Sequence, residues 1–327
     1  MKPHTPTSPL MVAILIAMGA AAHLSAQTVE FISVEKISNY IRNKDGVFLR
    51  VFDAPTQSFP YQFRIDVEGS DIPLATFLAP AGSSYELADP PADGGNHGLL
   101  FAGDDGWSRT FSFGSKGPTL SGYPGGTGPH PAGLDGVFHN GEYVVSALGE
   151  DVTLQLGGDA DADAYPGAPN PTVSAGTWDA GGIIKLYHNV NNPLTINTGT
   201  FANFGTDVVV SGLNLFVDHN GSELINLFSL SSDLLGLGLS NGTFTDFLEY
   251  TFAANTMVSG TDYYVSIEFF NLTDAQQVAG LDGALAVAMF TTRTQFIISA
   301  VPEPSTYAAI AGALALVGVM VVRRRRI

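Results

Sequence analysis

Short runs of β-branched and aromatic residues, separated by turn-forming residues, recur along most of the chain and limit the folds open to it. In Tyr61–Val67 (YQFRIDV) the odd positions are apolar and the even positions are polar. This alternation predicts a strand with one buried face and one solvent-exposed face. Gly122–Gly136 is too rich in glycine and proline to be an interior strand or a helix. Because sustained helical periodicity is scarce, the sequence predicts an all-β fold.

The predicted strands follow one another at a spacing of about ten residues, which is typical of an antiparallel β-sandwich or jelly-roll. Asn220-Gly221 and Asn241-Gly242 are signals for type I′ hairpin turns. Ser33–Arg42 fits the strand pattern least well, and a short helix is an alternative there. The predicted strands are Val47–Phe52, Tyr61–Val67, Leu99–Ala102, Arg109–Phe113, Tyr143–Ala147, Val152–Leu156, Gly182–His188, Leu194–Asn197, Val208–Val217, Leu224–Leu230, Phe244–Phe252, Tyr263–Phe270, Leu285–Phe290 and Thr294–Ser299.

A segment rich in glycine, proline and aspartate, Gly157–Pro171 (GGDADADAYPGAPNP), is the best candidate boundary within the chain. It has no apolar pair to bury, so it predicts a linker. The predicted organisation is therefore a β-sandwich module over residues 27–156 and a second one over residues 172–300. One larger sandwich is the alternative.

The last 27 residues, Val301–Ile327, combine three physically different pieces. Val301-Pro302-Glu303-Pro304 is stiff and extended, because proline fixes φ and disfavours helix at the residue before it. Ala308–Val322 is a run of fifteen uncharged residues. A cluster of four arginines follows. An apolar run that ends in such a cluster predicts a transmembrane helix whose positive end stays in the cytoplasm. The cluster is Arg323, Arg324, Arg325 and Arg326.

This tail, comprising the Pro-Glu-Pro motif, the apolar helix and the terminal arginines, closely resembles the PEP-CTERM sorting signal of exopolysaccharide-producing Gram-negative bacteria. The resemblance is limited to residues 301–327. It implies recognition by an exosortase, a membrane-embedded protease that cleaves at or near Pro302-Glu303-Pro304. The implied destination is the cell surface or the extracellular matrix, after transit through the inner membrane. The alternative is a membrane anchor that is never cut.

The other end of the chain predicts export by the Sec machinery. Met1–Ala26 has a positive charge at Lys2, an apolar stretch over Leu10–Ala22 and small residues at Ser25 and Ala26. These are the parts of a secretory signal peptide, with cleavage expected before Gln27. An uncleaved N-terminal anchor is the alternative. The predicted fold is thus a β body flanked by a signal helix and a transmembrane helix.

The composition of residues 27–300 limits the classes of partner that this part of the chain can bind. The formal net charge of the whole chain is −17; residues 27–300 keep 9 of its 14 basic and 30 of its 31 acidic residues, a net charge of −21. This charge argues against nucleic acid, because binding there depends on neutralising phosphates with lysine and arginine. It argues equally against anionic lipid. Without cysteine, the chain has no disulfides and must be held together by burial.

Two sets of residues are candidate binding positions. Asp159, Asp161 and Asp163 stand at alternate positions, as in the first half of a calcium loop. The pattern then stops, because Ala164 stands where that loop has its turn glycine, and a solvated linker is the alternative. Trp107 and Trp178 are candidate platforms for stacking sugar rings, and Tyr123, Tyr165 and Tyr187 are further candidates. Packing in the core or against turns is the alternative for these aromatic residues.

Motifs of hydrolytic enzymes are absent from the sequence: it has no Gly-x-Ser-x-Gly, no His-Glu-x-x-His and no phosphate-binding Gly-x-x-x-x-Gly-Lys. We therefore expect a non-catalytic protein without a cofactor, with a structural or adhesive role in the envelope, exopolysaccharide or biofilm. The first alternative is a surface module that binds carbohydrate or calcium. A secreted hydrolase with an unmarked carboxylate pair is the second.

Overall fold

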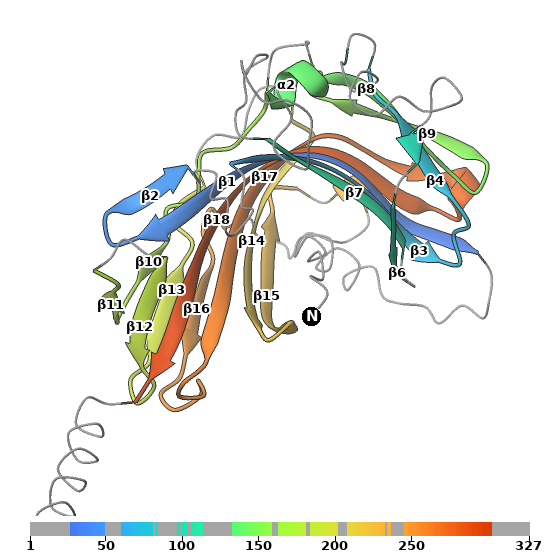
Figure 1. Cartoon of the computed structure of the whole chain (residues 1–327). Helices are drawn as coiled ribbons and strands as arrows, with labels where there is room; N and C mark the ends of the chain where they lie inside the picture. The colour runs from blue at the N-terminus through green and yellow to red at the C-terminus, as the bar shows by residue number, and fades with distance from the viewer. Residues whose placement is uncertain are drawn as a thin grey trace, which may run out of the picture.

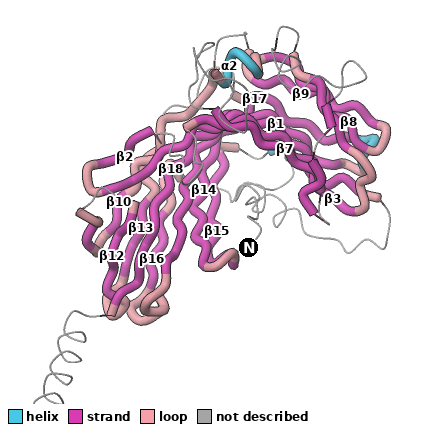
Figure 2. The backbone as a smooth tube through the Cα atoms, viewed as in Figure 1, coloured by secondary structure: helices cyan, strands magenta, loops and turns pink. Residues whose placement is uncertain are grey.

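A computed structural model describes most of the β-rich body (Figure 1). The described residues are 27–49, 60–80, 83, 97–98, 100–103, 106–113, 133–158, 163–180, 184–201, 208–232, 234–236 and 245–302. Strands dominate this part of the chain, and its helical content is limited to single short turns (Figure 2). The prediction of a β body is confirmed. The predicted signal helix and transmembrane helix lie outside the described residues.

A large, curved central sheet organises the described residues (Figure 1). It has eleven strands in the described part of the chain, eight of them in one continuous path. In spatial order the path is β15 (Ser222–Leu230), β14 (Val210–His219), β17 (Asp262–Val278), β18 (Ala284–Val301), β1 (Thr28–Asn43), β3 (Tyr61–Ser70), β7 (Gly106–Phe113) and β6 (Leu100–Gly103). Off the path, β2 (Gly46–Leu49) pairs with β1, β12 (Lys185–Asn189) pairs with β18, and β11 (Thr177–Trp178) pairs with β12.

Two small sheets accompany the central one. The first contains β5 (His97–Gly98), β4 (Ala75–Leu78), β8 (Gly141–Ala147) and β9 (Glu150–Leu156). The second contains β10 (Thr172–Val173), β13 (Leu194–Asn197) and β16 (Glu249–Phe252). Figure 1 shows them at opposite ends of the central sheet. The short helical turns are α2 (Leu134–Val137), η2 (Leu234–Gly236) and η3 (Ala279–Leu281).

Each small sheet buries one end of the central sheet. Phe77, Tyr143 and Leu154 of the β5–β4–β8–β9 sheet pack in one apolar cluster with Phe63 and Phe290 of the central sheet. The β10–β13–β16 sheet forms a second cluster with strands β14, β17 and β18. These contacts give the layered β architecture expected of a sandwich.

The two strands at the centre of the large sheet, β1 and β18, run parallel to each other. β12 also runs parallel to β18. The central sheet is therefore mixed, whereas the sequence predicted an antiparallel one. Parallel neighbours are usually covered on both faces. Most residues of β1 and β18 are indeed buried irrespective of the direction in which they point.

The alternative of a short helix over Ser33–Arg42 is wrong, because this segment lies within the sixteen-residue strand β1. β1 pairs with β18 along one edge and with β3 along the other. This pairing fixes its conformation. Burial on both faces removes the alternation that would have identified the strand from its sequence.

The prediction of a solvent-exposed face for Tyr61–Val67 is also wrong. The apolar side chains of Phe63 and Ile65 are buried as expected, but Arg64 and Asp66 are buried too, with 8% and 2% of their surface exposed. The strand and its alternation are present in β3. The polar side chains on its second face are buried among other charged groups.

Two further sequence signals can be compared with the described strands. The predicted strands Leu285–Phe290 and Thr294–Ser299 are parts of one strand, β18. At the hairpin between β14 and β15, Asn220 and Gly221 have φ values of 54° and 77°. Positive φ at both central residues is the requirement of a type I′ turn, so that prediction is confirmed. Asn241-Gly242 lies outside the described residues.

Strands from both sides of the predicted domain boundary share the central sheet: β1, β3 and β7 precede Gly157, and β14, β17 and β18 follow Pro171. The division into separate modules over residues 27–156 and 172–300 stays a prediction. The described part of the predicted linker, residues 163–171, is packed rather than solvated. Its proline residues Pro166, Pro169 and Pro171 are buried.

Side chains of the central sheet donate hydrogen bonds to backbone carbonyl groups of residues 163–171. Asn271 Nδ2 donates to the carbonyl oxygen of Ala164 at 2.8 Å. Thr292 Oγ1 donates to that of Gly167 at 3.1 Å, and Thr294 Oγ1 to that of Pro169 at 2.8 Å. These side chains satisfy carbonyl groups that a buried loop would otherwise leave without partners.

Candidate functional site

Five charged side chains lie on the face of the central sheet opposite the two small sheets. The pairing register places them on one face, since residues opposite each other in neighbouring strands point to the same side. Four are almost completely buried, and 12% of the Arg293 side chain is exposed. We call this group the charge layer: Glu35 of β1, Arg64 and Asp66 of β3, Glu268 of β17 and Arg293 of β18.

Four members of the charge layer form two ion pairs. Arg64 Nε lies 2.5 Å from Asp66 Oδ2 within β3. Arg293 Nε donates to Glu268 Oε1, also at 2.5 Å, between the adjacent strands β18 and β17. Neutralisation in pairs is the condition under which charges are tolerated in a protein interior.

Glu35 is the fifth charge and has no ion-pair partner of its own among the described residues. Burial raises its pKa from 4.5 to about 7; the positive charges of Arg293 and Arg64 oppose this rise, and Glu268 adds to it. Burial also raises the pKa of Asp66, although Arg64 partly offsets it. The charge layer therefore holds a carboxyl group that is partly protonated near neutral pH.

Polar groups without hydrogen-bond partners in the described structure surround the charge layer. They are buried atoms of Asn214 and Ser266, on strands β14 and β17. Asn214 is opposite Glu268 in the ladder, and Ser33 is opposite Asp66. The charge layer is thus a group of polar and charged side chains buried between neighbouring strands.

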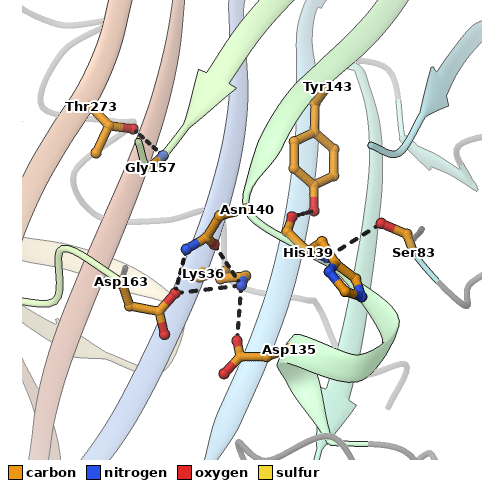
Figure 3. Close-up of polar contacts among 9 residues, drawn as sticks. All are labelled: Lys36, Ser83, Asp135, His139, Asn140, Tyr143, Gly157, Asp163 and Thr273. Carbon is orange, nitrogen blue, oxygen red and sulfur yellow. Dashed lines mark hydrogen bonds and ion pairs between the residues drawn. The ribbon is translucent and has the colours of Figure 1, made fainter. Parts of the chain in front are cut away.

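A second buried cluster lies on the opposite face of β1, around Lys36 (Figure 3). Lys36 Nζ donates to Asp135 Oδ1 at 2.9 Å and to Asn140 Oδ1 at 2.8 Å. Asp163 Oδ1 lies 3.6 Å from the same ammonium nitrogen and accepts from Asn140 Nδ2 at 2.9 Å. We call these four residues the lysine cluster. It joins β1, helix α2 and the start of the packed segment at residues 163–171.

The lysine cluster gives the position of one predicted calcium ligand. Only 5% of the Asp163 side chain is exposed, and the carboxylate faces the ammonium of Lys36. Asp159 and Asp161 lie outside the described residues. Within the part of the chain that the structure describes, no group of three or more histidine or acidic side chains is placed to hold a metal ion.

The predicted sugar platforms Trp107 and Trp178 pack against different apolar clusters, so they do not form one surface. Trp107 Nε1 donates to the carbonyl oxygen of Ile72 at 2.7 Å. Trp178 packs edge-on against Phe296, and the guanidinium carbon of Arg42 lies 5.2 Å from its ring centroid. Both indole rings are half-buried.

The other aromatic candidates have different surroundings. Tyr165 is half-buried and packs edge-on against Phe290, whereas Tyr187 is 40% exposed. Tyr123 lies outside the described residues.

The predicted sorting motif begins where the described fold ends. Val301 is the last residue of β18 and pairs with Asn189 of β12. Pro302 follows it outside the strand. Glu303, Pro304 and the arginines Arg323, Arg324, Arg325 and Arg326 lie outside the described residues, as does the predicted signal peptide. Among the helices that the structure describes, none has the length and apolar character needed to span a bilayer.

The sequence reasoning missed the charge layer as a group. Its signal is a charged residue inside an apolar strand run, as at Glu35, Arg64 and Glu268. When its strand is considered alone, each such residue is predicted to be solvent-exposed. Strand order and register are needed to bring the five together, and neither can be read from one strand.

Comparisons with known proteins do not assign the chain to a family. No protein-family model matches it, and no curated protein does. Among solved structures, the crystal structure of chicken CNTN1 FN1-FN3 domains matches 85% of this chain and 68% of that one, with 12% sequence identity and a TM-score of 0.17. At this TM-score the likeness carries no argument about fold or function.

Proposed function

We propose that the chain is an exported, non-catalytic β protein that an exosortase sorts to the cell surface or the extracellular matrix. Its role there is structural or adhesive, within the envelope or the exopolysaccharide. The inner membrane holds the protein only in transit, by its C-terminal helix. The observation that carries this proposal is the position of Val301, which ends a central strand of the fold and directly precedes the Pro-Glu-Pro motif.

This junction suits a protein that is cut after it has folded. Every residue of β18 that pairs with β1, β17 or β12 precedes Pro302. Cleavage at Pro302-Glu303-Pro304 would therefore leave the ladder of the central sheet complete. Because the Pro-Glu-Pro motif follows the last residue of β18 in the sequence, we expect the cleavage point to lie beyond the sheet, where a protease can reach it.

A structural role fits the polar groups inside the body. Buried charges pair with one another there: Arg64 with Asp66, Arg293 with Glu268, and Lys36 with Asp135. Such buried, mutually paired charges contribute to a specific arrangement of strands.

The proposal is tested by replacing Pro302 and Pro304 together by alanine in bacteria that contain an active exosortase. We expect the unchanged protein to yield a mature form that has lost both Met1–Ala26 and the terminal arginines, as measured by intact mass in envelope and medium. The double variant should stay full-length at its C-terminus and accumulate in the inner membrane. Pro193→Ala, in an exposed turn, is the control and should be processed normally. Recovery of unchanged protein with its arginines still attached would contradict the proposal.

A further inference from the structure

The face of the central sheet that carries the charge layer opens to solvent at the end where β18 finishes. There the ladder joins β12, β18, β17 and β14 side by side. Tyr187 on β12 is 40% exposed and Tyr264 on β17 is 52% exposed. Both side chains point to the same side as Ser299 and Ile297 of β18, with which they pair. The two rings thus stand on one face, separated by a single strand.

A charged pair occupies the space between the two rings. Lys185 Nζ donates to Asp262 Oδ2 at 2.8 Å, reaching across β18, and Ser299 Oγ donates to Asp262 Oδ1. The side chains of Lys185 and Asp262 remain 31% and 36% exposed. Each therefore keeps hydrogen-bonding capacity toward solvent, since an ammonium group has three donors and a carboxylate has about four acceptor positions.

The sheet fixes the spacing of these groups. Tyr187 and Tyr264 lie two strands apart laterally and one two-residue step apart along β18. Strand spacing and rise therefore separate their Cα atoms by roughly 12 Å. The hydroxyl group of Tyr187 also donates to Asp179 Oδ2 at 3.1 Å, which anchors that ring. Groups held in place before binding lose little conformational entropy on binding.

We infer that this surface, which we call the tyrosine face (Tyr187, Tyr264, Lys185 and Asp262), binds a neutral polysaccharide. A sugar ring has an apolar face that stacks on an aromatic ring, and hydroxyl groups that both donate and accept hydrogen bonds. The tyrosine face offers two rings with a donor and an acceptor between them. Their separation suits a ligand that extends over more than one sugar ring.

The charges nearby favour a neutral ligand over an anionic one. Asp218 pairs with Tyr264 in the ladder and lies next to Glu223. With a net charge of −17 on the whole chain, these carboxylates disfavour anionic headgroups and phosphates. An apolar protein surface is also disfavoured, because it would bury the Lys185–Asp262 pair without replacing its bonds to water. Hydroxyl groups replace those bonds.

This inference deepens the proposed function by naming a ligand, and it rests on that function only for its biological setting. The test is native gel electrophoresis of the detergent-solubilised full chain through gels that contain hydroxyethylcellulose or dextran, both neutral. We expect at least one of them to retard the unchanged protein. Tyr187→Ala and Tyr264→Ala should each weaken binding about tenfold, the larger end of what one aromatic contact contributes.

Conservative variants and controls separate stacking from loss of structure. Tyr264→Phe keeps the ring and should bind within about twofold of the unchanged protein, because the ring supplies the stacking area. Phe247→Ala removes another exposed aromatic ring, 43% exposed, from a segment outside the tyrosine face and should not affect binding. The melting temperatures of all four variants should match that of the unchanged protein, since these rings are exposed.

Several outcomes would overturn the inference. These are no retardation by either polysaccharide, equal retardation of both alanine variants and the unchanged protein, or tyrosine-dependent binding to phosphatidylglycerol vesicles without any polysaccharide binding. Cleavage and sorting of the tyrosine variants in cells should be normal. A failure of polysaccharide binding is therefore distinguishable from a failure of sorting, which depends on Pro302 and Pro304.

Discussion

Glu268 and Arg293 face each other across the two longest strands of the central sheet, with Glu268 Oε1 accepting from Arg293 Nε at 2.5 Å. Only 1% of the glutamate side chain and 12% of the arginine side chain are exposed. The pair joins β17 to β18 by a contact that adds to their backbone ladder. Because Glu268 is buried, its carboxylate cannot exchange this partner for water.

Removing one member of this pair should strongly destabilise the fold. We expect Arg293→Met to lower the free energy of unfolding by about 3–5 kcal/mol, because it leaves Glu268 as an uncompensated buried charge. Chemical denaturation at neutral pH measures the effect. Lys44→Met breaks the exposed pair with Asp45 and should change stability little. Equal effects of the two variants would show that burial does not govern the contribution of the pair.

Glu35 should make stability depend on pH near neutrality. Burial raises the pKa of its carboxyl group from 4.5 to about 7 in the folded protein. The folded state therefore keeps a proton that the unfolded chain releases, and stability falls as the pH rises from about 4.5 to about 7. By linkage, this fall amounts to roughly 3 kcal/mol.

Glu35→Gln replaces the carboxyl group by a neutral group of similar shape. We expect the variant to be more stable than the unchanged protein at pH 8 and similar to it at pH 4, as measured by denaturation midpoints. Glu142→Gln, on the exposed side of β8, is the comparison and should leave the pH profile unchanged. A steep loss of stability in Glu35→Gln at both pH values would mean that the glutamate is charged in the fold.

Lys36 should hold the packed segment at residues 163–171 against the body. Lys36→Met removes the positive charge facing Asp135 and Asp163, and we expect a loss of about 3 kcal/mol in stability. Limited proteolysis should then cut the chain near Asp163 faster than in the unchanged protein. Lys185→Met, which breaks a half-exposed pair, should leave both measurements close to those of the unchanged protein. Unaltered proteolysis in Lys36→Met would indicate that Asn271, Thr292 and Thr294 suffice to hold the segment.

Gly212 has no room for a side chain unless its neighbours shift, because a Cβ atom there would lie 2.3 Å from the ring of Phe270 and 2.8 Å from the carbonyl oxygen of Ser229. Gly212→Ala is therefore expected to cost about 1–3 kcal/mol, the usual range for overpacking a core. Thermal unfolding measures the loss. Adding Phe270→Leu should restore part of it by making room for the methyl group. Additive losses in the double variant would place the strain at the backbone contact instead.

The sequence was sufficient for features that depend on local pattern. The alternation in Tyr61–Val67 identified β3, and Asn220-Gly221 identified a type I′ turn, because both signals lie within a few adjacent residues. The β class follows from many such signals together. The candidate sorting motif was also found locally, and Val301 proves to be the last residue of a strand.

Features that depend on distant strands were not predicted. β1 is buried on both faces and pairs with β18, so its polar residues Ser33, Glu35 and Lys36 obscure its character as a strand. The charge layer and the tyrosine face depend on the register of strands far apart in the chain. A single sequence gives the direction of each side chain within its own strand, but not which neighbour that strand will have.

The parallel pairing of β1 with β18 also sets the order of events during synthesis. Phe31 lies beside Leu285 and Ile41 beside Gln295, so the first strand made must wait for the last one before the middle of the sheet can close. Contacts this far apart along a chain form slowly. A ribosome or a translocation channel that releases the chain from its N-terminus would thus hold back completion of the sheet until almost the entire body had emerged.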